Sequence, residues 1–252
     1  MNSTFLYAML LTTLAGLSTT FGSIISIFYK KPSHGYMAFT MGFSAGIMVM
    51  ISFVELLQSG IKTIGFVYGN LAFFLGMGAL FIIDVLLPHS YILEKFNSKD
   101  SSNSRLKKAS IFVALGIAIH NFPEGIVTFA GTMKDIDVGI TLAIAIALHN
   151  IPEGIAVSVP VYAATGSARK AFLWSFLSGI SEPIGALIAG IILMPFLNET
   201  VIGWMLSAVG GFMVFIAFDE LLPVSQSYKK EHISIIGVMV GMFLMSLSLA
   251  LF

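Results

Sequence analysis

Eight apolar stretches, each of about 20 residues or more, follow one another along the chain, and each can cross a bilayer as one helix. They cover residues 5–28, 36–58, 66–88, 109–131, 137–160, 170–196, 201–223 and 232–252. The stretches are too long for barrel strands and lack the alternating pattern of such strands. We therefore expect an all-α membrane protein with eight transmembrane helices, which form a single polytopic domain over residues 1–252.

The composition excludes several classes of protein. Hydrophobic residues make up 57% of the chain and charged residues only 10%, whereas about a quarter of the residues of a soluble domain are charged. Lys and Arg number 13 and balance 13 Asp and Glu, so no basic surface indicates a nucleic-acid partner. The chain has no cysteine, which excludes disulfides, thiolate metal ligands and thiol catalysis.

Basic residues are distributed unequally between the two sets of loops. One set holds only Lys62 and Lys134. The other set holds Lys30, Lys31, Lys95, Lys99, Arg105, Lys107, Lys108, Arg169, Lys170, Lys229 and Lys230. Because positively charged loops stay in the cytoplasm, we expect the second set, with the long polar loop 89–108, to be cytoplasmic. Both termini would then lie outside a cell (plasma or inner) membrane.

Two internal repeats relate distant parts of the chain. Residues 46–57 (GIMVMISFVELL) match residues 211–222 (GFMVFIAFDELL) at eight of twelve positions, in the second and seventh spans. Residues 117–126 (IAIHNFPEGI) match residues 146–155 (IALHNIPEGI), in the fourth and fifth spans. The spans of each pair run in opposite directions, so we expect a 3+2+3 inverted-repeat bundle. Transporters built from inverted repeats bind their substrate near mid-membrane on the repeat axis, where the two HNxPEG motifs are expected.

Each HNxPEG motif places its polar side chains on one side of a helix. His120 and Glu124 are four residues apart, and Asn121 and Glu124 are three apart, so the glutamate points between the other two side chains. The antiparallel helix repeats the arrangement with His149, Asn150 and Glu153. If the two faces meet, one cluster contains both His and both Glu, and a second contains both Asn and the same Glu. That is the geometry of a two-metal site bridged by carboxylates.

A proline and a glycine accompany each motif. Pro123 and Pro152 each leave a helical carbonyl without its N–H partner, which in lipid must be satisfied by protein, water or an ion. Gly125 and Gly154 allow a neighbouring helix to approach closely. Polar contacts that only hold helices together are the alternative, but matched pairs of His, Asn and Glu at mid-membrane favour an ion site.

Glu182, in the sequence SGISEPIGA of the sixth span, is a candidate third carboxylate ligand beside the two asparagines. The alternative is a buried glutamate that pairs with a hydroxyl such as that of Ser178. Imidazole, carboxylate and amide oxygen suit Zn²⁺, Fe²⁺, Mn²⁺, Co²⁺ and Cd²⁺, and do not suit Cu⁺, which prefers sulfur. The roles of five further residues stay open: Glu55, Asp84, His89, Asp219 and Glu220.

The chain resembles the ZIP (Zrt/Irt-like) family of divalent metal transporters over its whole length. The likeness rests on SFVELL (52–57), HNFPEG (120–125), HNIPEG (149–154), SGISEP (178–183) and AFDELLP (217–223). It implies a binuclear centre built from the fourth, fifth and sixth spans. By this likeness one metal would bind Glu124, His149 and Glu153, with His120, and the other would bind Asn121, Glu124, Asn150, Glu153 and Glu182.

We therefore expect a transporter for divalent metal ions, principally Zn²⁺, with the ion as transported substrate and with no cofactor. The resemblance implies movement toward the cytoplasm. An intramembrane zinc metalloenzyme and a divalent-cation channel are the alternatives, although HNxPEG lacks the HExxH arrangement and no repeated selectivity filter is visible. The Gly-rich segment 74–79 (FLGMGA) allows a homodimer without requiring one.

Overall fold

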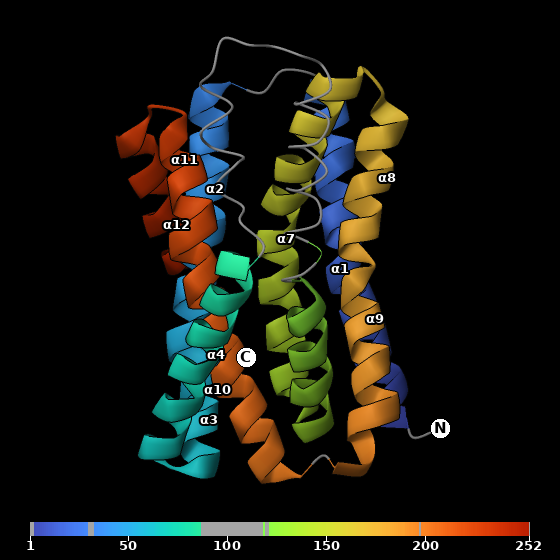
Figure 1. Ribbon diagram of the computed structural model, residues 1–252, viewed down its shortest axis with the longest axis vertical. Helices are drawn as coiled ribbons and strands as arrows, with labels where there is room; N and C mark the ends of the chain where they lie inside the picture. Colours follow the sequence, from blue (N-terminus) through green and yellow to red (C-terminus); the bar gives the residue numbers. More distant parts are fainter. Residues whose placement is uncertain (1–2, 30–32, 87–117, 119–120, 197, 252) are drawn as a thin grey trace.

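Every element that the computed structural model describes is helical (Figure 1). The described residues are 3–29, 33–86, 118, 121–196 and 198–251. In chain order the elements are α1 (Ser3–Tyr29), α2 (His34–Ile51), η1 (Ser52–Leu56), α3 (Leu57–Ile64), α4 (Phe66–Leu86), a helix over residues 121–134, α7 (Ile136–Thr165), α8 (Ala168–Gly179), α9 (Ser181–Ile188), η2 (Ala189–Leu193), η3 (Met194–Phe196), α10 (Glu199–Ile216), η4 (Ala217–Leu221), α11 (Leu222–Ser227) and α12 (Glu231–Leu251). The all-α prediction is confirmed.

Seven helical rods among the described residues are long and apolar enough to cross a membrane. They run over Ser3–Ser26, His34–Ile64, Phe66–Val85, Ile136–Val159, Ala168–Ile192, Glu199–Ser227 and Glu231–Ala250, and they coincide with seven of the eight predicted stretches. The fourth predicted stretch, 109–131, lies partly outside the described residues, which include its second half as helix 121–134. The predicted loop 89–108 lies wholly outside them.

The outward faces of these rods are covered with large apolar side chains. Phe66 and Phe74 on α4 are exposed, as are Met239 and Phe243 on α12. An apolar surface of this extent is unfavourable in water and matches the hydrocarbon of a bilayer.

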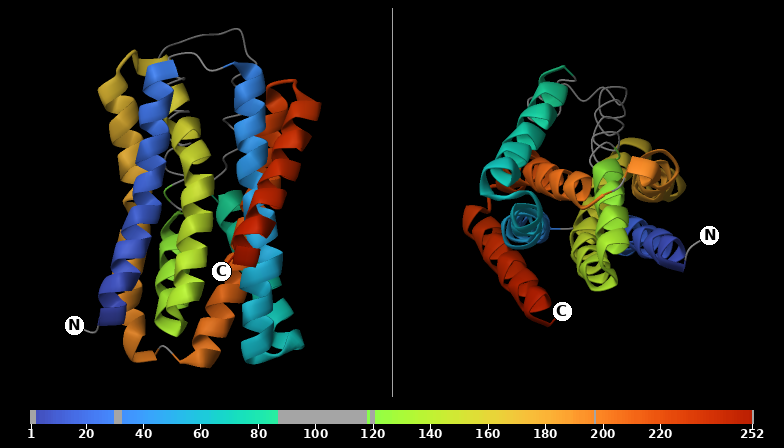
Figure 2. Two further views of the ribbon diagram at one scale, coloured as in Figure 1. Left: turned by 180° about the vertical axis from the view of Figure 1, so that it is seen from behind. Right: turned by 90° about the horizontal axis from the view of Figure 1, so that it is seen from below.

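The rods form two bundles that stand side by side (Figure 2). The first bundle contains α1, helix 121–134, α7 and the α8–α9 rod. The second bundle contains the α2–η1–α3 rod, α4, the α10–η4–α11 rod and α12. Within the first bundle α1 packs along α7 and α8, and within the second α2 packs along α12 and α10 along α4. Helices α2 and α7 contact each other across the seam between the bundles.

Glycines bring backbones into direct contact inside each bundle. A Cβ on Gly16 of α1 would lie 2.3 Å from the carbonyl oxygen of Gly179 of α8, and a Cβ on Gly179 would lie 2.2 Å from that of Gly16. In the second bundle, a Cβ on Gly46 of α2 would lie 2.2 Å from the carbonyl oxygen of Val238 of α12. Contacts this close leave no space for a side chain, so each bundle is tightly packed.

The seam is packed differently. Among the described glycines, every one that closely faces another helix faces a helix of its own bundle. The seam is filled instead by apolar side chains of one continuous cluster, which includes Met48 and Ile51 of α2, Ile146 of α7 and Leu206 of α10. The two bundles therefore meet through side chains, whereas the helices inside each bundle meet through backbone as well as side chains.

Two π-helical turns occupy matching positions of the longer sequence repeat. η1 covers Ser52–Leu56 and η4 covers Ala217–Leu221, which are the same positions of the aligned segments 46–57 and 211–222. A π-turn widens the helix by one residue and is frequent at functional sites. Each turn contains one of the paired carboxylates, Glu55 and Glu220, and Glu55 accepts a hydrogen bond from the hydroxyl of Ser59 at 2.8 Å.

Candidate metal centre

Six of the seven predicted ligands lie among the described residues, and all six are buried. Helix 121–134 carries Asn121 and Glu124, α7 carries His149, Asn150 and Glu153, and the first turn of α9 carries Glu182. These three helices belong to the first bundle, so the site lies inside one bundle beside the seam. The seventh predicted ligand, His120, lies outside the described residues.

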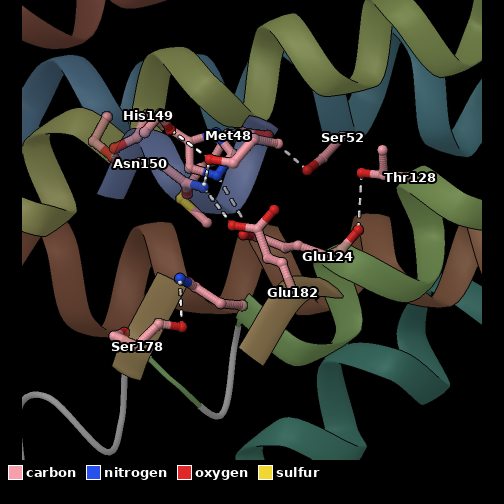
Figure 3. Close-up of polar contacts among 12 residues, drawn as sticks. Met48, Ser52, Glu124, Thr128, His149, Asn150, Ser178 and Glu182 are labelled. Carbon is pink, nitrogen blue, oxygen red and sulfur yellow. Dashed lines mark hydrogen bonds and ion pairs between the residues drawn. The ribbon is translucent and has the colours of Figure 1, made fainter. Parts of the chain in front are cut away.

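Glu124 and His149 form the first contact of the site. The Nε2 atom of His149 lies 3.1 Å from Oε1 of Glu124 (Figure 3), and the two side chains are at most 1% exposed. Two ligand atoms that bind one tetrahedral Zn²⁺ at its usual bond lengths lie about 3.3 Å apart. The two atoms are therefore close enough for both to reach a single ion, and the same distance suits a hydrogen bond between them.

Asn150 and Glu182 form the second contact. The amide Nδ2 of Asn150 donates to Oε1 of Glu182 and, at 3.0 Å, to the backbone carbonyl of Ala15 on α1 (Figure 3). This contact joins three helices, α1, α7 and α9. It places the carboxylate of the sixth predicted span next to an asparagine of the fifth.

Backbone carbonyls fix the orientation of both asparagines. Asn121 donates through Nδ2 to the carbonyl of Ser178 at 3.4 Å, and Asn150 donates to that of Ala15. A carbonyl only accepts hydrogen bonds, so the amide nitrogen must face it and the amide oxygen must point away. Within the described residues, Oδ1 of both asparagines is buried without a hydrogen-bond donor.

Two carboxylates each have one oxygen that is likewise buried without a hydrogen-bond donor. Oε2 of Glu124 and Oε2 of Glu182 are buried and have no hydrogen-bond donor among the described residues. A buried oxygen without a donor is unfavourable by about 1–3 kcal/mol. Four such oxygens on three neighbouring helices make up a set of ligands that a hard or borderline divalent cation would satisfy.

The negative charge of the site also favours a bound cation. Glu124 and Glu182 are buried, and no Lys or Arg in the part of the chain that the structure describes is buried with them. An ionised carboxylate in a low-dielectric interior needs a nearby positive charge or must take up a proton. The site therefore favours binding of cations or protons.

Glycines hold helix 121–134 against α9, and α7 against α1. A Cβ on Gly125 would lie 2.0 Å from the carbonyl oxygen of Glu182, and a Cβ on Gly154 would lie 1.8 Å from that of Thr19 on α1. The prediction that these two glycines admit a close neighbour is confirmed. Gly185 adds a reciprocal contact, because its Cβ would lie 2.2 Å from the carbonyl oxygen of Phe122.

The structure adds several details to the predicted site. The described residues contain no group of three His, Asp or Glu side chains close enough together to hold an ion, and His120, which belongs to the first predicted cluster, lies outside them. The hydroxyl of Ser178 does not form a hydrogen bond with Glu182. The backbone carbonyl of Ser178 instead accepts a hydrogen bond from the amide of Asn121. Sequence reasoning also missed Ala15, because a backbone acceptor has no sequence signature. Gly16 and Gly22 of α1 are the sequence feature that could have indicated how closely α1 packs against α7 and α8.

Comparisons with known proteins identify the family. Residues 84–249 match the family described as "ZIP Zinc transporter". The chain is 44% identical to "Zinc transporter ZupT" of Streptococcus mutans over 97% of each chain. It is 43% identical to the protein of that name from Clostridium perfringens, over 98% of this chain and 96% of the relative. It is 44% identical to that from Oceanobacillus iheyensis over 98% of each.

This chain belongs to the ZIP family. It is therefore a multi-pass membrane transporter and not an enzyme, so the metalloenzyme alternative is set aside.

Proposed function

We propose that this protein imports zinc across the cell membrane through the His/Asn/Glu site of the first bundle. Fe²⁺, Mn²⁺, Co²⁺ and Cd²⁺ are further candidate substrates, because the same ligand types suit all of them. The proposed ligands are His120, Asn121, Glu124, His149, Asn150, Glu153 and Glu182. They would form two adjacent positions that share Glu124 and Glu153.

One observation carries the proposal: Oε2 of Glu124, Oε2 of Glu182 and Oδ1 of both asparagines are buried without a hydrogen-bond donor among the described residues. Polar contacts that only hold helices together would satisfy these oxygens, whereas a site for a transported cation keeps them available for the ion. The relatives at 43–44% identity are named zinc transporters, which supports zinc as the ion.

The proposed direction rests on charge and on the family resemblance. The excess of Lys and Arg in the loops after the first, third, fifth and seventh spans supports a cytoplasmic position for those loops. Helices α1 and α12 then begin and end on the outside. An ion that enters from there would exchange its water shell for imidazole nitrogen and carboxylate oxygen. Two ions that share carboxylates repel each other, which would help release to the cytoplasm.

The proposed movement is a displacement of the first bundle against the second. Backbone contacts hold the helices together inside each bundle, whereas side chains fill the seam. We therefore expect each bundle to move as a unit and the two bundles to slide past each other along the seam. The first and sixth spans of the proposed repeat lie in the first bundle, and the second, third, seventh and eighth lie in the second. This distribution, with the matched π-turns, supports the 3+2+3 inverted repeat.

Zinc entry into proteoliposomes that contain a fluorescent metal indicator tests the proposal. We compare the parent protein with Glu153→Ala, which removes a proposed shared ligand, and with Glu199→Gln, which removes an exposed carboxylate at the start of α10. Saturable entry in the parent and in Glu199→Gln, abolished in Glu153→Ala, is the expected result.

Two outcomes would contradict the proposal. Entry that survives Glu153→Ala would show that the shared carboxylates are not the obligatory path. Flux that rises linearly with zinc, without saturation, would favour the channel alternative over a carrier.

A further inference from the structure

A buried serine of the second bundle touches the backbone of a predicted ligand in the first. The hydroxyl of Ser44 on α2 donates to the carbonyl oxygen of His149 on α7 at 3.3 Å. Both residues are fully buried. The bond therefore crosses the seam at the level of the metal centre.

Among the described residues, the other interhelical bonds from a serine hydroxyl to a backbone carbonyl stay inside one bundle. Ser175 on α8 donates to the carbonyl of Thr19 on α1 at 2.9 Å, and Ser225 on α11 donates to that of Ala38 on α2. These bonds would be kept in a movement of one bundle against the other. The bond from Ser44 would break, because a displacement of a few Å exceeds the range of a hydrogen bond.

A second bond crosses the seam near one end of the molecule. The Nζ atom of Lys134, at the end of helix 121–134, donates to the hydroxyl of Thr63 on α3 at 3.1 Å. This contact is exposed, so it is accessible to reagents and reports whether the bundles are in the arrangement seen here.

We propose that Ser44 is a positioning residue that sets the level of His149, and with it the metal centre, relative to the second bundle. The inference rests on the proposed function, since it gives His149 its role as ligand. Ser44 does not contact the imidazole ring through this bond; it acts on the backbone of α7. The bond favours the arrangement seen here, and every other arrangement of the two bundles lacks it.

The expected size of the effect follows from the strength of one buried hydrogen bond. Removal of such a bond changes an equilibrium constant by about fivefold. Because a displacement of the bundles breaks the Ser44 bond, loss of the hydroxyl shifts the population away from the present arrangement.

The test uses the absence of cysteine from the chain. Thr63→Cys and Lys134→Cys are introduced together, and the initial rate of their joining by a short bifunctional thiol reagent measures how often the bundles adopt this arrangement. Ser44→Ala is then added to this protein. Ser44→Thr, which keeps the hydroxyl, and Ser175→Ala, which removes a matched bond inside the first bundle, are the controls.

The joining rate should fall by up to about fivefold in Ser44→Ala and should be kept in Ser44→Thr. Ser175→Ala should lower the thermal unfolding midpoint without changing the joining rate. Equal joining rates in Ser44→Ala and Ser175→Ala would overturn the positioning role. Zinc flux of the parent is measured in parallel: a parent without zinc flux contradicts the proposed function, whereas equal joining rates contradict the role of Ser44.

Discussion

Each predicted asparagine ligand is oriented by a backbone carbonyl of a neighbouring helix, which has no signature in the sequence. The HNxPEG spacing predicts that Asn121 and Asn150 share a helix face with a glutamate, and both are buried as expected. The direction of each amide is set by the carbonyls of Ser178 and Ala15. The sequence therefore predicts which residues lie in the site. That their amide oxygens point away from the carbonyls of α1 and α8 follows only from the packing of those two helices against the asparagines.

Glu124 is the predicted ligand whose charge we expect to matter most, because it contacts His149 and would be shared by both ions. Glu124→Gln keeps the shape and the acceptor oxygen that faces His149 but removes the negative charge. We expect zinc flux to fall more than tenfold (over about 1.4 kcal/mol), while the unfolding midpoint of the metal-free protein stays equal or rises, since a neutral amide is easier to bury. Flux assays and thermal unfolding measure both. Normal flux with a lowered midpoint would contradict the ligand role.

Acid should weaken transport at the same residues. Protons compete with zinc for imidazole nitrogen and carboxylate oxygen. At pH values below the pKa of a ligand, each proton that zinc must displace raises the zinc concentration for half-maximal flux by about tenfold per pH unit. Flux at low zinc should therefore fall from neutral to mildly acidic pH and recover at saturating zinc. A half-saturation concentration that is the same at both pH values would argue against proton competition at the site.

At the scale of the helices, glycine positions decide how the ligands come together. Gly125 and Gly154 were predicted to admit neighbours, and they pack against the backbones of α9 and α1. Gly76, in the Gly-rich segment that allows a homodimer, packs against α10 of the same chain, where its Cβ would lie 2.1 Å from the Ala208 carbonyl oxygen. That glycine is therefore explained by a contact within the chain.

A matched pair of substitutions tests this packing. Gly125→Ala would place a methyl group 2.0 Å from the Glu182 carbonyl oxygen, whereas a Cβ on Gly78 of α4 meets nothing within 4 Å. Gly125→Ala should displace α9 and its glutamate, lowering stability by about 1–3 kcal/mol and reducing flux. Gly78→Ala should change neither. Unfolding midpoints and zinc flux check the pair, and equal behaviour of the two variants would contradict the assigned contacts.

At the scale of the whole molecule, the helices and their order were predictable but their grouping was not. Long apolar runs indicate spans directly, and seven of the eight are matched by described helices. The spans are apolar on all sides, so their sequence periodicity does not say which face meets which neighbour. The division into two bundles emerges only from the positions of the glycine contacts and of the side chains in the seam.

The two-bundle account predicts different effects for two cross-links. Joining Thr63→Cys to Lys134→Cys with a short thiol reagent should arrest zinc flux, because it ties the bundles together. A disulfide between Ser26→Cys and Ser158→Cys, whose hydroxyls lie 2.5 Å apart on α1 and α7, should leave flux intact, because both helices belong to the first bundle. Flux that persists after complete joining across the seam would contradict movement of one bundle against the other.

Zinc should bind the buried His, Asn and Glu side chains of the first bundle. The X-ray absorption spectrum of the purified, zinc-loaded protein at the zinc edge measures the ligands of the ion. We expect nitrogen and oxygen neighbours at about 2.0–2.2 Å, with an imidazole contribution that decreases in His149→Ala and without sulfur at about 2.3 Å. A shell of water oxygens alone, a sulfur neighbour, or a spectrum unchanged by His149→Ala would contradict it.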